Sequence, residues 1–170
     1  MSVRALTLLL AGILLAAGSA SAQPPRDMAS AGRVIAALDV ELDWEKANAV
    51  LDEDRVVAAV VDSVLRVALG ARYVLADSAR LGAAQARLHA TGDHCRTVAC
   101  AAAVGREVGA DRVLLAKLTK ISTPVWFVTG TLVDVRTGRV LRADEFELKG
   151  QPADIVPKGM VVLARRMSAL

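Results

Sequence analysis

Two cysteines, Cys95 and Cys100, have the clearest capacity for chemistry in this sequence. In an oxidising compartment an even pair of cysteines is expected to form a disulfide bond. A metal site is a weaker interpretation, because the C-x4-C spacing is wider than usual and the adjacent His94 adds only a third ligand. Free thiols are the other alternative, although thiol oxidoreductases use a C-x-x-C spacing. We therefore predict a structural disulfide, no metal and no cofactor.

Acidic residues are grouped at two places, where paired carboxylates could act as general acid and base. Asp39 and Glu41 share one face near the end of a predicted strand, and Asp52, Glu53 and Asp54 open a predicted helix. A helix N-terminus favours negative charge, which gives the second group a structural explanation. Because no nucleophile is paired with a base, we predict no catalytic residue. An enzyme built on Asp39 and Glu41 is the minor alternative.

The two tryptophans are candidates for a binding surface. Trp44 follows the strand that carries Asp39 and Glu41, and Trp126 lies on a later strand. An exposed tryptophan is typical of an interface, whereas a buried one belongs to the core or its rim. We treat Asp39, Glu41, Trp44 and Trp126 as a possible interaction surface, with the core alternative open for both tryptophans.

Phosphate and nucleic-acid binding are both disfavoured. Gly105 and Gly109 lie within and just after a predicted helix, whereas a dinucleotide-binding loop places its glycines between a strand and a helix N-terminus. Close packing of the helix and a C-cap explain these two glycines. The sequence contains 21 basic and 18 acidic residues, and its basic residues are scattered apart from Arg165 and Arg166. So balanced a charge predicts no nucleic-acid partner.

The first residues have the features of a secretory signal peptide. Arg4 precedes an apolar run over residues 6–17, and Ala20-Ser21-Ala22 forms an A-x-A cleavage site. The run is shorter than the roughly 20 apolar residues of a membrane anchor. We expect a signal peptide at residues 1–22, a flexible leader at 23–32 and a single domain at 33–170. The mature chain is then expected to be soluble, periplasmic or secreted from a bacterium, and not membrane-spanning.

Hydrophobic periodicity and turn residues predict one mixed sheet of about five strands with helices packed on it, an α/β (α+β) fold. The expected order is β-α-β-α-α-β-β-β-α. Strands are expected near residues 34–42, 72–75, 111–121, 125–135 and 140–148. Helices are expected near 52–69, 78–88, 97–108 and 154–168, the first of them rich in valine on two sides and ended by Gly70.

The cysteine spacing fixes how their helix begins. Five residues of regular helix would hold the two Cα atoms beyond the roughly 7 Å that a disulfide spans. Cys95 must therefore precede the helix and Cys100 must lie in its first turn, with Thr97 as a plausible N-cap. So short a loop contributes only about 2 kcal/mol in the chain-entropy model.

Several segments together resemble an uncharacterised family of short predicted secreted bacterial proteins, a domain of unknown function. The shared features are the paired cysteines before a helix and the sequences VIAALDVELDW, GREVGADRVLLAKLTKIS, LVDVRTGRVLRA and KGQPADIVPKGMVVLARR. A more distant resemblance links the chain to the TolB N-terminal domain and to CsgG, where G-A-D also leads into a strand and D-x-x-T-G turns a hairpin. The chain departs from the family at Ile155-Val156-Pro157, where the family usually has an aromatic residue.

The resemblance implies a TolB-N-like domain but no catalytic residues. Export, this fold and the absence of a catalytic pattern favour a periplasmic binding or accessory module that contacts another envelope protein. The alternatives are a carrier of a small apolar ligand between the Val-rich helix and the sheet, and an enzyme.

Overall fold

The structure is a computed structural model that describes residues 33–44, 50–90 and 95–169. The predicted signal peptide and leader lie outside the described residues, and so does His94. Within the described ranges, no helix has the length and apolar character needed to cross a bilayer.

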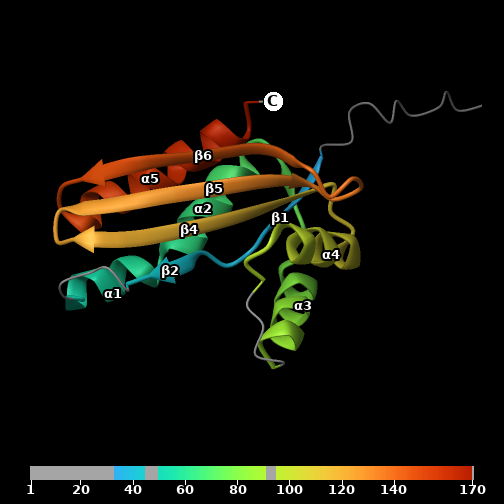
Figure 1. The fold of residues 1–170 in the computed structure, drawn as a ribbon, viewed down its shortest axis with the longest axis horizontal. Coiled ribbons are helices and arrows are strands. Elements are labelled where there is room, and N and C mark those ends of the chain that lie inside the picture. Colours follow the sequence, from blue (N-terminus) through green and yellow to red (C-terminus); the bar gives the residue numbers. More distant parts are fainter. Residues whose placement is uncertain (1–32, 45–49, 91–94, 170) are drawn as a thin grey trace, which may run out of the picture. The chain divides into compact units, whose positions relative to one another are not determined.

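An open, mixed six-stranded sheet forms the centre of the fold (Figure 1). Its main path runs β3-β1-β4-β5-β6, and β2 pairs with β4 beside that path. The pairs β1–β3, β1–β4 and β2–β4 are parallel, and β4, β5 and β6 form an antiparallel meander. The strands are β1 (Val34–Ala37), β2 (Glu41–Asp43), β3 (Val74–Leu75), β4 (Arg112–Ser122), β5 (Val125–Asp134) and β6 (Val140–Lys149). The predicted fold class is confirmed.

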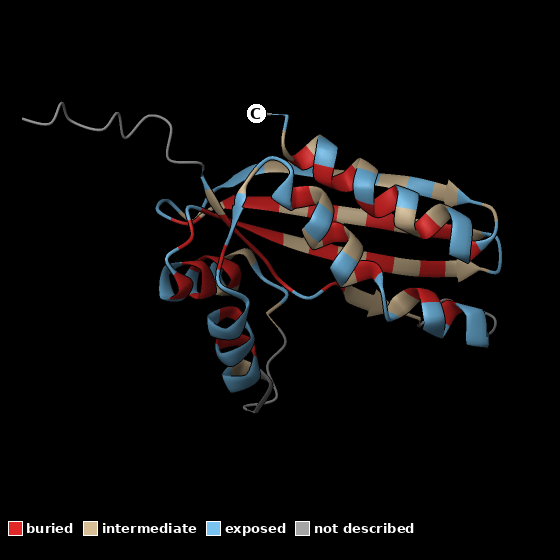
Figure 2. Cartoon of the chain, turned by 180° about the vertical axis from the view of Figure 1, so that it is seen from behind, coloured by how far each residue is buried: buried red, intermediate tan, exposed pale blue. Residues whose placement is uncertain are grey.

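The helices lie on both faces of this sheet but cover them unequally. Helices α1, α2 and α5 cover one face along the length of the meander (Figure 2), whereas α3 and α4 cover the other face only near β1. The helices are α1 (Asp52–Ala58), α2 (Val61–Gly70), α3 (Ser78–Ala90), α4 (Val98–Val108) and α5 (Pro152–Met167). Among the described residues, no helix therefore covers the rest of that face, which we call the open face.

Two predicted elements are each divided in the structure. The predicted strand over 34–42 is interrupted at residues 38–40, where the Val40 N–H donates to Asp62 Oδ1 of α2 at 2.7 Å. The predicted helix from residue 52 breaks between α1 and α2, with Val60 as the N-cap of α2. Gly70 was predicted to end this helix as a C-cap, and that was wrong, because Gly70 is the last residue of α2 and Ala71 is the cap, in a right-handed conformation.

The predicted features of α4 are confirmed. Thr97 is the N-cap of α4, and its Oγ1 accepts from the Cys100 N–H at 3.2 Å. Gly109 ends the helix with a φ of 72°, which glycine adopts without steric cost. A Cβ on Gly105 would collide with Val113 and Val135, so this glycine allows α4 to lie close to the sheet.

Candidate functional site: the open face of the sheet

The open face is formed by alternate residues of β2, β4, β5 and β6. Side chains on a strand point alternately to opposite faces. On β4 the even positions from 114 to 118 face α1, α2 and α5, whereas the odd positions face the other side, where α4 covers Val113 and the later positions are only partly buried. Lys117 and Thr119 are accordingly half-buried, while Leu118 is 1% exposed. The pairing registers place Glu41, Lys117, Thr129 and Glu145 in one row across the four strands. The next row is Asp43, Thr119, Phe127 and Glu147.

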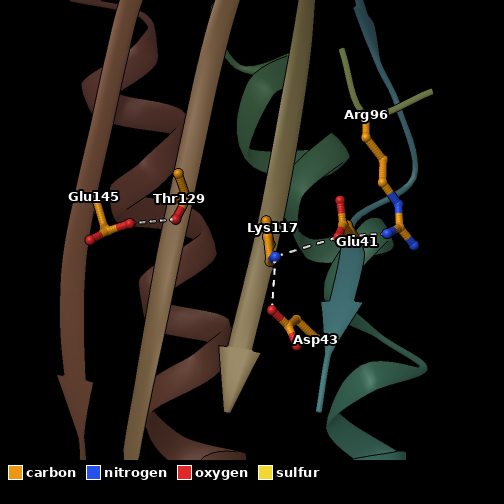
Figure 3. Close-up of polar contacts among 6 residues, drawn as sticks. All are labelled: Glu41, Asp43, Arg96, Lys117, Thr129 and Glu145. Carbon is orange, nitrogen blue, oxygen red and sulfur yellow. Dashed lines mark hydrogen bonds and ion pairs between the residues drawn. The ribbon is translucent and has the colours of Figure 1, made fainter. Parts of the chain in front are cut away.

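Polar contacts around the first row link β2 to β4 and β5 to β6 (Figure 3). Lys117 Nζ lies 2.8 Å from Asp43 Oδ2 and 3.5 Å from Glu41 Oε1. Arg96 NH1, from the segment before α4, lies 3.6 Å from the same Glu41 oxygen. On the far side, Thr129 Oγ1 is hydrogen-bonded to Glu145 Oε2 at 3.0 Å. The open face therefore presents an ordered polar surface.

Lys117 is the cation at the centre of this row. Its hydrogen bond to Asp43 is the largest cause that raises the pKa of its ammonium group. Burial acts in the opposite direction, and the charge of Glu41 adds a smaller effect that again raises the pKa. Because the group is already protonated at neutral pH, these contacts keep it charged. Lys117 is thus a permanent positive charge between two carboxylates.

A groove of about 450 Å³ lies where this face meets the part of the chain that carries the disulfide. Cys95 and Arg96 line one side of it, and Lys117 and Thr131 line the sheet side. The Cys95–Cys100 disulfide is present, with a Cα–Cα distance of 5.4 Å. The disulfide joins Cys95 to the first turn of α4. It therefore fixes the edge of the groove formed by Cys95 and Arg96, which we call the rim.

The candidate catalytic pair, Asp39 and Glu41, is not brought together as an acid–base pair. Asp39 accepts a hydrogen bond of 2.9 Å from Arg66 of α2, whereas Glu41 faces Lys117 and Arg96. Asp62 near Asp39 has its pKa raised, chiefly by burial, although the Val40 N–H acts in the opposite direction. Among the described residues, no group of three or more His, Cys, Asp or Glu side chains is arranged to hold a metal ion.

The two tryptophans of the predicted surface lie against each other. Their ring centroids are 5.6 Å apart in an edge-to-face arrangement, with Trp44 half-buried. Trp126 is only 1% exposed and lies on the helix-covered face, so its place in an interaction surface is corrected to a place in the core. Phe127, the next residue, points to the opposite face and is half-buried beside Glu147.

A buried ion pair was missed by reasoning from the sequence. Lys120 and Asp54 are both 0% exposed, and Lys120 Nζ contacts the Asp54 carboxylate. The same ammonium group lies 5.5 Å from the centroid of the Trp126 ring, and Asp54 Oδ2 also accepts from the Leu51 N–H at 2.6 Å. The even position of Lys120 on β4 was the available signal, since it shares the parity of Leu114 and Leu118. Asp54 is therefore an anchor of α1 and not a solvated helix-start residue.

The sequence matches the model of the family DUF3280, described as "Protein of unknown function (DUF2380)", over residues 33–167. The chain belongs to this family. No curated protein matches it in sequence. The prediction of an uncharacterised family is thereby confirmed.

Solved structures share the fold at low sequence identity. The LpoB C-terminal domain from Salmonella enterica is 20% identical, with a TM-score of 0.52 over 73% of this chain and 87% of that chain. The same domain from Escherichia coli is 22% identical, also at 0.52, over 70% and 84%. TolB from Acinetobacter baumannii is 12% identical, at 0.43, over 81% of this chain and 28% of that chain.

Proposed function

We propose that this protein is an exported, non-catalytic accessory module that uses the open face of its sheet to bind another protein of the bacterial envelope. The observation that carries the proposal is the unequal covering of the sheet, because none of the helices that the structure describes lies over the rows of side chains on β2, β4, β5 and β6. The signal-like N-terminus supports export, and the fold shared with the LpoB domain supports an envelope role by analogy.

The chemistry of this face favours a partner segment with lysine or arginine side chains. Glu145 and Glu147 stand exposed on β6, and the aromatic ring of Phe127 lies in the same row as Glu147. On the other side of the face, Lys117 is already engaged by Asp43 and Glu41. A half-buried aromatic residue flanked by carboxylates is suited to contact a basic, partly apolar segment.

Site-specific crosslinking in intact cells tests the proposal. A photo-crosslinking amino acid is placed at Glu145 on the open face and, as a matched control, at Lys158 on the exposed side of α5. We expect one reproducible envelope protein to crosslink at position 145 and not at 158, and the double variant Glu145→Lys/Glu147→Lys to weaken its capture. Equal crosslinking at both positions, or none at 145, would contradict the proposal.

The predicted alternative, an apolar ligand between the Val-rich helix and the sheet, has less support. Val61, Leu65 and Leu69 of α2 are each at most 1% exposed and pack in one cluster with Leu114 and other sheet residues. A ligand at that place would have to displace these core side chains, at a cost of several kcal/mol.

A further inference from the structure

The valine-rich segment of α1 and α2 is apolar on two sides, and the fold uses only one of them. Val57 and Val61 are buried against the sheet. Val56, Val60 and Val67 face outward and are 68%, 41% and 75% exposed. Scattered exposed valines are ordinary on a protein surface, but Val67 lines a groove, and an exposed apolar side chain there calls for a physical explanation.

A groove of about 550 Å³ lies between α2 and α5, on the side of these helices that faces away from the sheet. The two helices lie side by side in Figure 2. Val64, Val67 and Ala68 line the groove from α2, and Val161, which is 50% exposed, lines it from α5. Arg72 and Arg165 are the charged residues of its lining. The volume is in the range that suits a small ligand.

A second hollow, of about 380 Å³, shares Arg72 with this groove. It is lined by Arg33, Arg72 and Arg112 together with Tyr73 and Ser168, which come from four separate parts of the chain. Four guanidinium groups thus line two adjoining depressions.

Arg112 places a buried guanidinium group, held in position by its neighbours, at the hollow. The residue is 8% exposed, its NH1 group donates to Tyr73 Oη at 2.9 Å, and its guanidinium carbon lies 5.7 Å from the Tyr73 ring centroid. The Tyr73 hydroxyl is in turn held by the Met167 carbonyl at 3.3 Å. These contacts orient the guanidinium group without neutralising it.

The carboxylates near Arg112 accept hydrogen bonds from other groups. Asp134 stands opposite Arg112 in the strand pairing. The pKa of its carboxyl is lowered chiefly by two hydrogen bonds of 2.7 Å that its Oδ1 accepts from Thr137, and the charge of Arg112 contributes a smaller lowering. Asp111 accepts from the Val34 N–H at 2.8 Å. Within the described part of the chain, no ion pair includes Arg33, Arg72, Arg112 or Arg165. A buried guanidinium group without a carboxylate partner is a favourable place for an anion from outside.

We propose that the groove and the hollow together bind one molecule of an anionic amphiphile. Its alkyl chain lies along the valines between α2 and α5, and its phosphate or carboxylate head group meets Arg72 and Arg112. The occupant is a single molecule and not a membrane surface, because the groove volume fits one chain and Arg112, the cation at its charged end, is only 8% exposed. This site lies across the sheet from the open face and is independent of the accessory role.

Calorimetric titration of the purified protein with dodecyl phosphate, below its micelle concentration, tests the site. We expect saturable binding with one molecule per chain. Dodecyl maltoside, with the same chain and a neutral head, and inorganic phosphate, with no chain, are each expected to bind at least about tenfold more weakly. Equal binding of dodecyl maltoside, or no binding of dodecyl phosphate, would overturn the proposal.

Substitutions inside the two linings are compared with matched substitutions elsewhere on the surface, so that a loss of binding at the site can be told from a general effect of surface charge. Arg72→Glu and Val67→Asp change exposed residues of the hollow and the groove, and each is expected to weaken dodecyl phosphate binding by about tenfold or more. Arg139→Glu in the β5–β6 turn and Val56→Asp on α1 are the matched controls, also exposed but outside both linings. Circular dichroism verifies that all four variants fold. Equal losses in variants and controls would refute the site.

A second experiment distinguishes binding of a single amphiphile molecule from binding to a membrane surface. The protein is sedimented with vesicles of phosphatidylcholine and phosphatidylglycerol, and separately mixed with monomeric lysophosphatidylglycerol. Binding of the monomer that is sensitive to Arg72→Glu and Val67→Asp supports the proposal. Binding to vesicles without binding of either monomeric amphiphile would overturn it in favour of a membrane-surface contact.

Discussion

Two lysines three residues apart on β4 lie in opposite environments. Lys120 is 0% exposed on the helix-covered face and contacts Asp54, whereas the Lys117 side chain is 38% exposed on the open face and meets Asp43 and Glu41. Both are ion-paired, and the strand places them on opposite sides because side chains alternate. The same type of contact is therefore a buried ion pair within the core on one face and a solvent-exposed ion pair on the other.

The difference follows from what lies above each face. On the covered face, α1 brings Asp54 down to Lys120, and the Trp126 ring closes over the ammonium group. Water is excluded there, so each charge depends on its partner. On the open face, solvent screens the charges around Lys117, and side chains can exchange partners at little cost. The ion pair on the covered face therefore contributes to stability, whereas the open face is the surface that we propose for contact with a partner.

Replacing Lys120 is expected to have the largest effect. Lys120→Ala leaves the Asp54 carboxylate buried without its cation, which should lower the free energy of unfolding by about 3–5 kcal/mol. Urea unfolding followed by circular dichroism measures it. The double variant Asp54→Leu/Lys120→Met removes both charges and should be more stable than Lys120→Ala. If Lys120→Ala costs less than the corresponding change at Lys117, the contrast between the faces is wrong.

Adjacent aromatic residues on β5 extend the comparison. Trp126→Ala empties a fully buried position and is expected to cost about 3–5 kcal/mol of stability. Phe127→Ala removes a ring that is only partly buried, so about 1–2 kcal/mol is expected. Thermal and urea unfolding of both variants measure the two values. Phe127→Ala, but not a control at exposed Val161, should also weaken capture of the envelope partner, and equal stability losses in the pair would count against an open face.

The alternation along β4, β5 and β6 could be predicted because it is local. The strand boundaries over Arg112–Ser122, Val125–Asp134 and Val140–Lys149 follow from residue period and from the turn at Gly138, which has a φ of 68°. The disulfide was predicted from an even pair of cysteines in an exported chain, and the reach of that bond then placed the helix start and its N-cap at Thr97. Each of these depends on residues close together in the sequence.

Features that depend on distant residues could not be predicted in the same way. Asp54 and Lys120 are separated by 66 positions, and nothing near either residue indicates that they meet. The break between β1 and β2 involves Asp62 of α2 binding the Val40 N–H, a contact across 22 positions. Which face of the sheet remains open likewise depends on where α3 and α4 pack. The burial of Trp126 is a consequence of the same long-range packing.

The disulfide is expected to have a smaller effect than either core change. Cys95→Ser/Cys100→Ser opens a loop with a sequence separation of 5, which should lower stability by about 2 kcal/mol in the chain-entropy model. The loss should be reproduced by a reducing agent on the wild-type protein, as measured by urea unfolding. Because Arg96 lies between the cysteines, partner capture at position 145 should also decline. A loss as large as that of Lys120→Ala would show that this rim supports the whole core.

The smallest effect is expected at Lys117. Lys117→Met should cost less than about 1 kcal/mol, because solvent and salt screen this exposed group of charges. The raised pKa means that the folded state holds the Lys117 proton more tightly than the unfolded chain does. The contribution of Lys117 is therefore fully present below the ordinary lysine value of 10.5 and is lost as the pH rises through the higher folded value.

Urea unfolding of wild type and Lys117→Met from neutral to strongly alkaline pH measures this dependence. The stability difference should stay constant across neutral pH, disappear at high pH and shrink in high salt, while the effect of Lys120→Ala should persist in high salt. A salt-resistant loss at Lys117 would mean that its cluster is shielded from solvent. The open face would then be part of the core. The contrast between buried Lys120 and exposed Lys117 would be wrong.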